Sequence, residues 1–249
     1  MQPLPDPTGF QLTPTLHTHP NDATNPVKNQ LKKPFSVVVL GASKGIGFGV
    51  AETYAKAGAT TIILAARSES ITTRAQELKT KYPSSHIVGV SADVATATSM
   101  QQLAEQIRQV LGPAGYLDCI VANAAYYGPM TTSVLSGDPS DFSCVLDTNV
   151  LGVYHAARYL LPLLLASGDS AKSFIAVSSL GAWMVKGEVA HTAACVSKLA
   201  QLRLVQMISE EFREQGILAT AVHPGFVLTD MSAVVDEEWR KRESWSKYI

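Results

Sequence analysis

The residues best placed to do chemistry lie in the segment "HTAACVSKLA", residues 191 to 200. The Lys198 ammonium could hold positive charge beside a reacting group. A side chain four residues earlier would lie one helical turn away on the same face, where a proton donor would help. That position holds Ala194. A methyl group cannot transfer a proton, so a candidate catalytic lysine is combined with a missing acid or base.

A second group of candidate residues is the glycine-rich turn "GASKGIG", with Gly41, Gly45 and Gly47. It follows the β-branched run "SVVVL" and opens a stretch with helical spacing. Glycines let the backbone approach a phosphate, and a helix N-terminus supplies free N–H groups and a positive dipole. Such a turn after the first strand of a βαβ unit predicts a dinucleotide site.

The elements that must position these residues alternate along the chain. Strands that are apolar throughout are typical of a parallel sheet buried on both faces, and right-handed crossovers then give a doubly wound sheet. The sequence predicts a single α/β Rossmann domain over residues 35–249, after an irregular tail over 1–34. The expected strands are 36–40, 61–65, 86–90, 117–121, 173–177 and 219–222, and the expected helices are 45–57, 70–81, 96–111, 140–165 and 194–215.

The end of the second strand indicates which dinucleotide binds. In this fold an acidic residue there bonds the ribose 2′-hydroxyl of NAD. Here the strand is followed by Arg67, with no acid until Glu69, and Lys44 lies inside the glycine loop. Each cation alone could be a solvated surface charge, but both together suit a 2′-phosphate. We expect NADP(H) rather than NAD(H).

Several motifs, in order and with sensible spacing, resemble those of the short-chain dehydrogenases/reductases over about residues 35–231. They are "GASKGIG", "ADV", "ANAA", "TNVLG", "VSSLGA", "CVSK" and "VHPGFVLTDM". The resemblance implies that the cofactor is bound by Leu40, Gly41, Ser43, Lys44, Gly45, Ile46, Gly47, Arg67, Asp93, Val94, Asn123, Ala124, Lys198, Val227 and Thr229.

The resemblance also implies an NADP-dependent oxidoreductase that moves a hydride between the cofactor and a carbonyl or alcohol carbon. Ser179, preferred to Ser178, would hold the substrate oxygen. Lys198 would bond the nicotinamide ribose, and Asn149 would position a water that links the lysine to solvent. The family's proton-transferring tyrosine falls at Ala194. We expect slow turnover with intact cofactor binding, because a positioned general acid contributes about 10²–10⁴-fold.

Three explanations of Ala194 stay open. The alanine is a knock-out of a working reductase, or the scaffold now serves ligand binding or non-redox chemistry, or a neighbour carries the proton. The neighbours considered are His191, Tyr126, Tyr127 and, with less support, Cys195. Because Lys198 and Asn149 are retained, we favour a functional parent enzyme with a single changed residue.

Other departures concern the loops. Leu40 replaces a threonine whose hydroxyl braces the neighbouring loop, and Ala122 and Ala125 replace the Asn and Gly of the family's NNAG turn. After Thr229 no further strand is evident in the sequence. We therefore expect the usual C-terminal strand and substrate-covering segment to be missing or altered.

Bulk properties narrow the partners. Lys plus Arg number 20 and Asp plus Glu 21, which gives no reason to expect nucleic acid or an anionic membrane. The start "MQPLPDPTGF" does not resemble a signal peptide, and "YLLPLLLASG" is too short to span a bilayer. Three widely spaced cysteines favour a reducing, cytoplasmic setting. His17 and His19 lack further ligands, so no metal is expected.

The sequence predicts long helices with wide apolar faces over two stretches, residues 149–165 and 197–212. One layer of contact with the sheet does not cover all of that surface. The family commonly pairs these helices across a twofold axis, so we expect a homodimer.

Overall fold

The computed structural model describes residues 22–32, 34–129, 131–168, 171–185, 191–225 and 227–231. Within them lies a six-stranded parallel sheet of order β3-β2-β1-β4-β5-β6, which confirms the predicted doubly wound fold. The strands are β1 (Ser36–Leu40), β2 (Thr61–Ala66), β3 (His86–Ser91), β4 (Cys119–Ala122), β5 (Lys172–Val177) and β6 (Ile217–Val222). The helices are α1 (Gly45–Lys56), α2 (Ile71–Lys81), α3 (Ala97–Leu111), α4 (Pro139–Leu146), α5 (Gly152–Leu165) and α6 (Thr192–Glu211).

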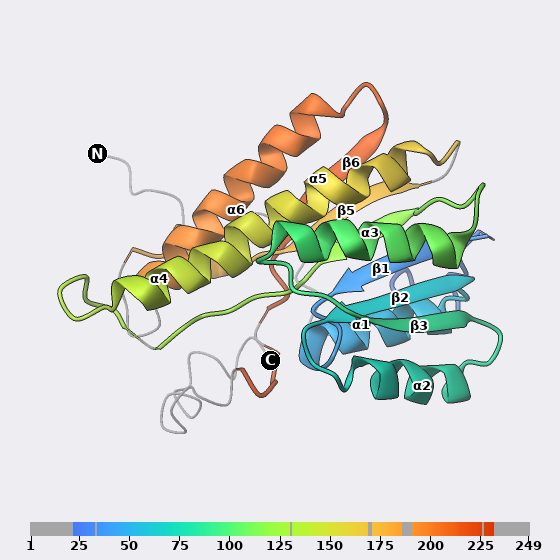
Figure 1. Cartoon of the computed structure of the whole chain (residues 1–249), viewed down its shortest axis with the longest axis horizontal. Helices are drawn as coiled ribbons and strands as arrows, with labels where there is room; N and C mark the ends of the chain where they lie inside the picture. The colour runs from blue at the N-terminus through green and yellow to red at the C-terminus, as the bar shows by residue number, and fades with distance from the viewer. Residues whose placement is uncertain are drawn as a thin grey trace.

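Helices cover both faces of the sheet (Figure 1). Helices α3, α5 and α6 pack on one face around residues such as Met100, Leu160 and Val205, and α1 and α2 pack on the other around Ala51 and Leu78. Every residue of β1, β2 and β4 is buried, as strands apolar on both faces require.

From β1 the chain adds β2 and β3 on one side of the sheet and then returns to add β4, β5 and β6 on the other side of β1. The strand order therefore reverses between β1 and β4. In open parallel sheets the loops that leave the strands diverge at such a point and form a ligand crevice at the carboxyl ends. The glycine loop after β1 and the "ANAA" turn after β4 both lie there. The topology therefore brings together motifs that are about 80 residues apart, as the hydrogen bond from Asn123 to Gly41 shows.

One predicted helix differs from the structure. The stretch 140–165 is divided into α4, a π-helical turn (Asp147–Leu151) and α5. A π turn places one extra residue in the helix and is frequent at functional sites. Here it contains the buried Asn149, so the irregular turn lies at a candidate catalytic residue. The region beyond Met231, where the seventh strand is in question, lies outside the described residues.

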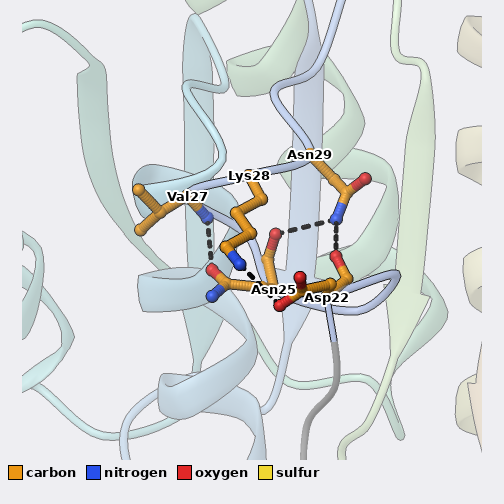
Figure 2. Close-up of polar contacts among 5 residues, drawn as sticks. All are labelled: Asp22, Asn25, Val27, Lys28 and Asn29. Carbon is orange, nitrogen blue, oxygen red and sulfur yellow. Dashed lines mark hydrogen bonds and ion pairs between the residues drawn. The ribbon is translucent and has the colours of Figure 1, made fainter.

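The described part of the N-terminal stretch forms turns held by its own side chains (Figure 2). Asn29 Nδ2 donates to the carbonyl oxygens of Asp22 and Asn25, at 2.6 and 3.0 Å. The chain then reaches the end of α1, where the Leu31 amide donates to the Ala57 carbonyl at 2.9 Å. Residues 22–32 thus lie against the domain, and the histidines at 17 and 19 lie outside the described residues.

Candidate active site

A cleft of ≈ 480 Å³ lies at the carboxyl ends of the strands and runs from the glycine loop to helix α6. Twelve of the residues predicted to bind the cofactor line it: Gly41, Ser43, Lys44, Gly45, Ile46, Arg67, Asp93, Val94, Asn123, Ala124, Lys198 and Thr229. Three do not line it. Leu40 and Gly47 are buried behind the glycine loop, and Val227 is 40% exposed beyond the cleft.

The glycine loop is packed so closely that two of its glycines have no room for a side chain. Gly41 has a φ of +78°, and a Cβ there would lie 2.6 Å from the Ala124 Cα. A Cβ on Gly47 would lie 2.3 Å from the Gly41 carbonyl oxygen, which also accepts a 2.9 Å hydrogen bond from Asn123 Nδ2. The loop is therefore pressed against the turn after β4, despite the two alanines that replace that turn's usual residues.

Helix α1 opens directly onto this cleft. Its N-cap residue, Lys44, provides no side-chain cap, and Gly45 and Ile46 of the first turn line the cleft. Uncapped N–H groups at a helix N-terminus form an anion site for a phosphate. This end of the cleft therefore fits the pyrophosphate of a dinucleotide.

The end of β2 supplies the cleft with Arg67 and Ser68 and with no carboxylate. Lys44, the other predicted cation, forms an ion pair with Asp230, with Nζ 3.0 Å from the carboxylate oxygen. Both of those side chains are mostly exposed, so the pair is weak and easily exchanged for another anion. Arg67 is therefore the stronger candidate for contact with a 2′-phosphate.

An arginine that sequence reasoning missed braces the loop from behind. Arg74 Nε donates to the Ser43 carbonyl at 3.2 Å, and its guanidinium lies 3.9 Å from the centre of the Phe48 ring. Both contacts cross between α2 and the loop–α1 segment. No local motif marks Arg74, because the partner is 31 residues away in the chain.

At the other end of the cleft, Lys198 is 2% exposed. Its Nζ donates to the Val177 carbonyl at 2.8 Å and to Gln201 Oε1 at 3.3 Å. Burial lowers the pKa of Lys198 to about 8. Gln201 Nε2 in turn donates to the Asn149 carbonyl at 3.2 Å. The Gln201 side chain therefore links the lysine to Asn149, whereas the family resemblance implies a water at Asn149 that links the lysine to solvent.

The side chain of Asn149 holds the loop after β4. Its Oδ1 accepts from the Tyr126 amide and its Nδ2 donates to the Tyr126 carbonyl, both at 2.8 Å. Nδ2 also donates to Ser197 Oγ on α6 at 2.9 Å. Asn149 thus fixes the backbone beside Tyr127, a residue that lines the cleft.

The two serines after β5 have different surroundings. Ser178 lines the cleft, and its buried Oγ has no hydrogen-bond partner among the described residues. Ser179 lines neither cavity; its Oγ accepts from the Gly181 amide at 3.1 Å, and the hydroxyl lies close enough to Tyr127 to lower the pKa of that phenol. Ala194 is buried in α6 and lines neither this cleft nor the second cavity beside it.

A second cavity, of ≈ 380 Å³, lies beside the first. Most of its lining surface is apolar, with Phe142 and Val145 of α4 contributing, although Asp138 and Asp141 also line it, and His191 and Thr192 border it at the start of α6. His191 Nδ1 is buried without a partner among the described residues, and burial lowers the pKa of this histidine. Tyr127 is the one described residue that lines both cavities.

No group of three His, Cys, Asp or Glu side chains suited to a metal ion is present in the described part of the chain. Nor does any described helix have the length and apolar character needed to cross a membrane.

Residues 36–240 match the sequence model of the short chain dehydrogenases. The chain belongs to the short-chain dehydrogenase family. Its similarity to individual members is moderate. The short chain dehydrogenase pgmD of Aspergillus terreus is 31% identical over 225 residues, which cover 87% of this short-chain dehydrogenase and 72% of pgmD.

Solved structures are similar to a comparable degree. A structure of L-sorbose reductase from Gluconobacter frateurii with NADPH and L-sorbose has a TM-score of 0.75 and 25% identity, covering 88% of this short-chain dehydrogenase and 81% of that chain. A Pseudomonas aeruginosa RhlG/NADP complex has a TM-score of 0.73 and 26% identity, covering 84% of this short-chain dehydrogenase and 79% of that chain. The predicted family is confirmed, and the roles of the individual site residues stay predictions.

Proposed function

We propose that this short-chain dehydrogenase is an NADP(H)-dependent oxidoreductase acting on a carbonyl or alcohol. One observation carries the proposal: a single cleft joins the phosphate-binding glycine loop and Arg67 to the buried Lys198. The relatives support it, since one was solved with NADP and another with NADPH and a sugar. The experiment is to mix the protein with NADPH and a panel of carbonyl compounds and to follow loss of nicotinamide absorbance.

The residues of the chain have separate tasks in this reaction. The open N-terminus of α1 binds the pyrophosphate, and Arg67 binds the 2′-phosphate. Lys198 is held at the far end of the cleft by the Val177 carbonyl and directs its remaining N–H toward the ribose of the nicotinamide. The Ser179 hydroxyl holds the substrate oxygen. When bound, the cofactor supplies or accepts the hydride.

A second candidate function rests on Ala194, which removes the family's proton-transferring side chain. A ligand-binding or non-redox protein on the same scaffold would bind NADP(H) equally well. The two functions differ in the assay above, because a binding protein leaves NADPH unoxidised with every carbonyl.

The cofactor preference depends on Arg67. Arg67→Ala should weaken NADP(H) binding by about tenfold or more and leave NAD(H) binding unchanged, because a charge-assisted hydrogen bond is worth about 1.5–3 kcal/mol. Titration calorimetry with both cofactors measures this. Arg108→Ala removes the same charge from the exposed end of α3, away from the cleft, and serves as the control. Equal affinities of the unmodified chain for NADP(H) and NAD(H) would contradict the prediction.

We also propose a homodimer formed through α5 and α6. Helix α6 presents Val196, Leu199 and Met207 at 46–62% exposure, and Tyr154 on α5 is 49% exposed. Residues 196, 199 and 207 have a spacing that places them on one helix face.

Leu199→Asp should weaken this dimer by about tenfold or more, because a charge would be buried in an apolar interface. Light scattering across a dilution series measures the mass. Leu218→Asp, at an apolar position of β6 that is 65% exposed and lies off this face, is the matched control. The dimer would be excluded by a monomeric mass of the unmodified chain at micromolar concentration.

A further inference from the structure

Because Ala194 cannot donate a proton, the proposed reaction needs another proton donor near the place where the two cavities meet. Four neighbours of position 194 are indicated by the sequence as donors in place of the family's tyrosine: His191, Cys195, Tyr126 and Tyr127. Burial lowers the pKa of His191, so the ring is neutral at neutral pH and lies on the second cavity only. Burial raises the pKa of Cys195, and this thiol lines neither cavity. Tyr126 is 38% exposed and also lines neither.

Tyr127 is placed differently from the other three. It alone among the described residues lines both the cofactor cleft and the second cavity, and its side chain lies close enough to Ser179 for that hydroxyl to lower the pKa of the phenol. Ser179 is the residue assigned to the substrate oxygen. Ser179 itself lines neither cavity, so it is Tyr127 that lies at their junction, where a substrate held against the cofactor must also lie.

The loop that carries Tyr127 is fixed in place. Asn149 binds both the amide and the carbonyl of the preceding residue, Tyr126, at 2.8 Å. Gly128, the following residue, has a φ of +67° and packs against Val145 of α4. A catalytic side chain needs this kind of support, because a small misplacement costs much of the rate.

We propose that Tyr127 donates the proton to the substrate oxygen, in place of the side chain that Ala194 lacks. This rests on the proposed function. As a hydride from the reduced cofactor forms a C–H bond with the carbonyl carbon, the π pair of the C=O bond moves to oxygen. The Tyr127 O–H bond breaks, its proton forms the alcohol O–H, and the phenolate is reprotonated by water. The carbonyl is reduced and the cofactor oxidised.

The surroundings suit reduction more than oxidation. Burial raises the pKa of Tyr127, and the nearby Ser179 hydroxyl lowers it by a smaller amount. The phenol is therefore protonated at neutral pH, which is the form that reduction of a carbonyl requires. The second cavity, with its largely apolar lining, would hold the rest of the molecule, so the substrate class is a carbonyl compound with an apolar body.

The test compares Tyr127→Phe with Tyr126→Phe, which deletes the same hydroxyl one residue earlier. Tyr127→Phe should lower the rate of NADPH oxidation by about 10²–10⁴-fold with NADPH affinity unchanged, and Tyr126→Phe should change neither. In the Tyr127→Phe background, Ala194→Tyr should restore most of the rate, because a phenol then enters from α6. A retained rate in Tyr127→Phe, or an equal fall in its NADPH affinity, would overturn the proposal while the proposed function stands.

A second readout needs no cofactor. In protein with isotope-labelled tyrosine ring carbons, the resonance lost in Tyr127→Phe should titrate above the usual tyrosine range, and Ser179→Ala should move its pKa further up. A resonance unaffected by Ser179→Ala would show that the phenol does not interact with Ser179 and would overturn the proposal. If the unmodified chain oxidises NADPH with none of the carbonyl compounds, the proposed function is wrong, and the role proposed for Tyr127 is then wrong as well.

Discussion

Gly47→Ala is expected to weaken NADP(H) binding by about a hundredfold or more. The added Cβ would lie 2.3 Å from the Gly41 carbonyl oxygen and 2.5 Å from Asn123 Nδ2. The first of these atoms belongs to the backbone of the glycine loop, so the loop must move to make room. A displaced loop no longer directs the α1 N-terminus at the pyrophosphate, and a loss of about 3 kcal/mol corresponds to a hundredfold in affinity.

The matched control lies two residues further along the same helix. A Cβ on Gly49 would meet nothing within 4 Å, and this residue is exposed. Gly49→Ala should therefore keep the affinity and stabilise the fold by up to about 1 kcal/mol through helix propensity. Calorimetric titration and thermal unfolding measure both effects. The packing described for the loop would be wrong if the two variants bound NADP(H) equally well.

Lys198→Met should lower turnover by about a hundredfold or more and at the same time stabilise the fold at neutral pH. The amine is buried, with its pKa lowered from 10.5 to about 8. Between pH 10.5 and about pH 8 the unfolded chain binds a proton on this amine and the folded chain mostly does not. The buried lysine therefore destabilises the fold more and more as the pH falls through this range. Below the lower value the full effect is present, roughly 3 kcal/mol at most.

The net gain in stability should be smaller, about 1–2 kcal/mol, because methionine leaves Gln201 Oε1 and the Val177 carbonyl without their donor. The gain should disappear above about pH 10.5, where neither state carries the charge. Denaturant unfolding over a pH series measures it, with Lys79→Met on the exposed face of α2 as control. A destabilised variant at neutral pH would show that the charge is better solvated than its burial indicates.

The sequence predicts the fold well because the information is local. Continuous apolar runs such as residues 36–40 specify buried strands without reference to any distant residue, and the glycine loop marks the first crossover by itself. The single predicted helix over 140–165 is the main difference. Its π turn depends on how Asn149 meets Tyr126 and Ser197, contacts that span 23 and 48 residues and that periodicity does not record.

The candidate site was predictable only where a motif carries it. Residues that line the cofactor cleft, such as Arg67 and Asp93, follow strand ends and could be placed by position. Gln201 and Arg74 act through partners from other elements, so their residue types alone give no signal. The sequence offers Tyr127 as one of four possible proton donors. Only its position in the lining of both cavities distinguishes it from the other three.

Hydride transfer itself is tested most directly by following NADPH labelled with deuterium at the transferring carbon. The unmodified chain, supplied with apolar aldehydes and ketones, is predicted to oxidise the cofactor and to yield an alcohol that carries the deuterium on the former carbonyl carbon. A protein that binds NADPH tightly yet leaves it unoxidised, with no deuterium in any product, would contradict the oxidoreductase function and favour a binding role for the same cleft.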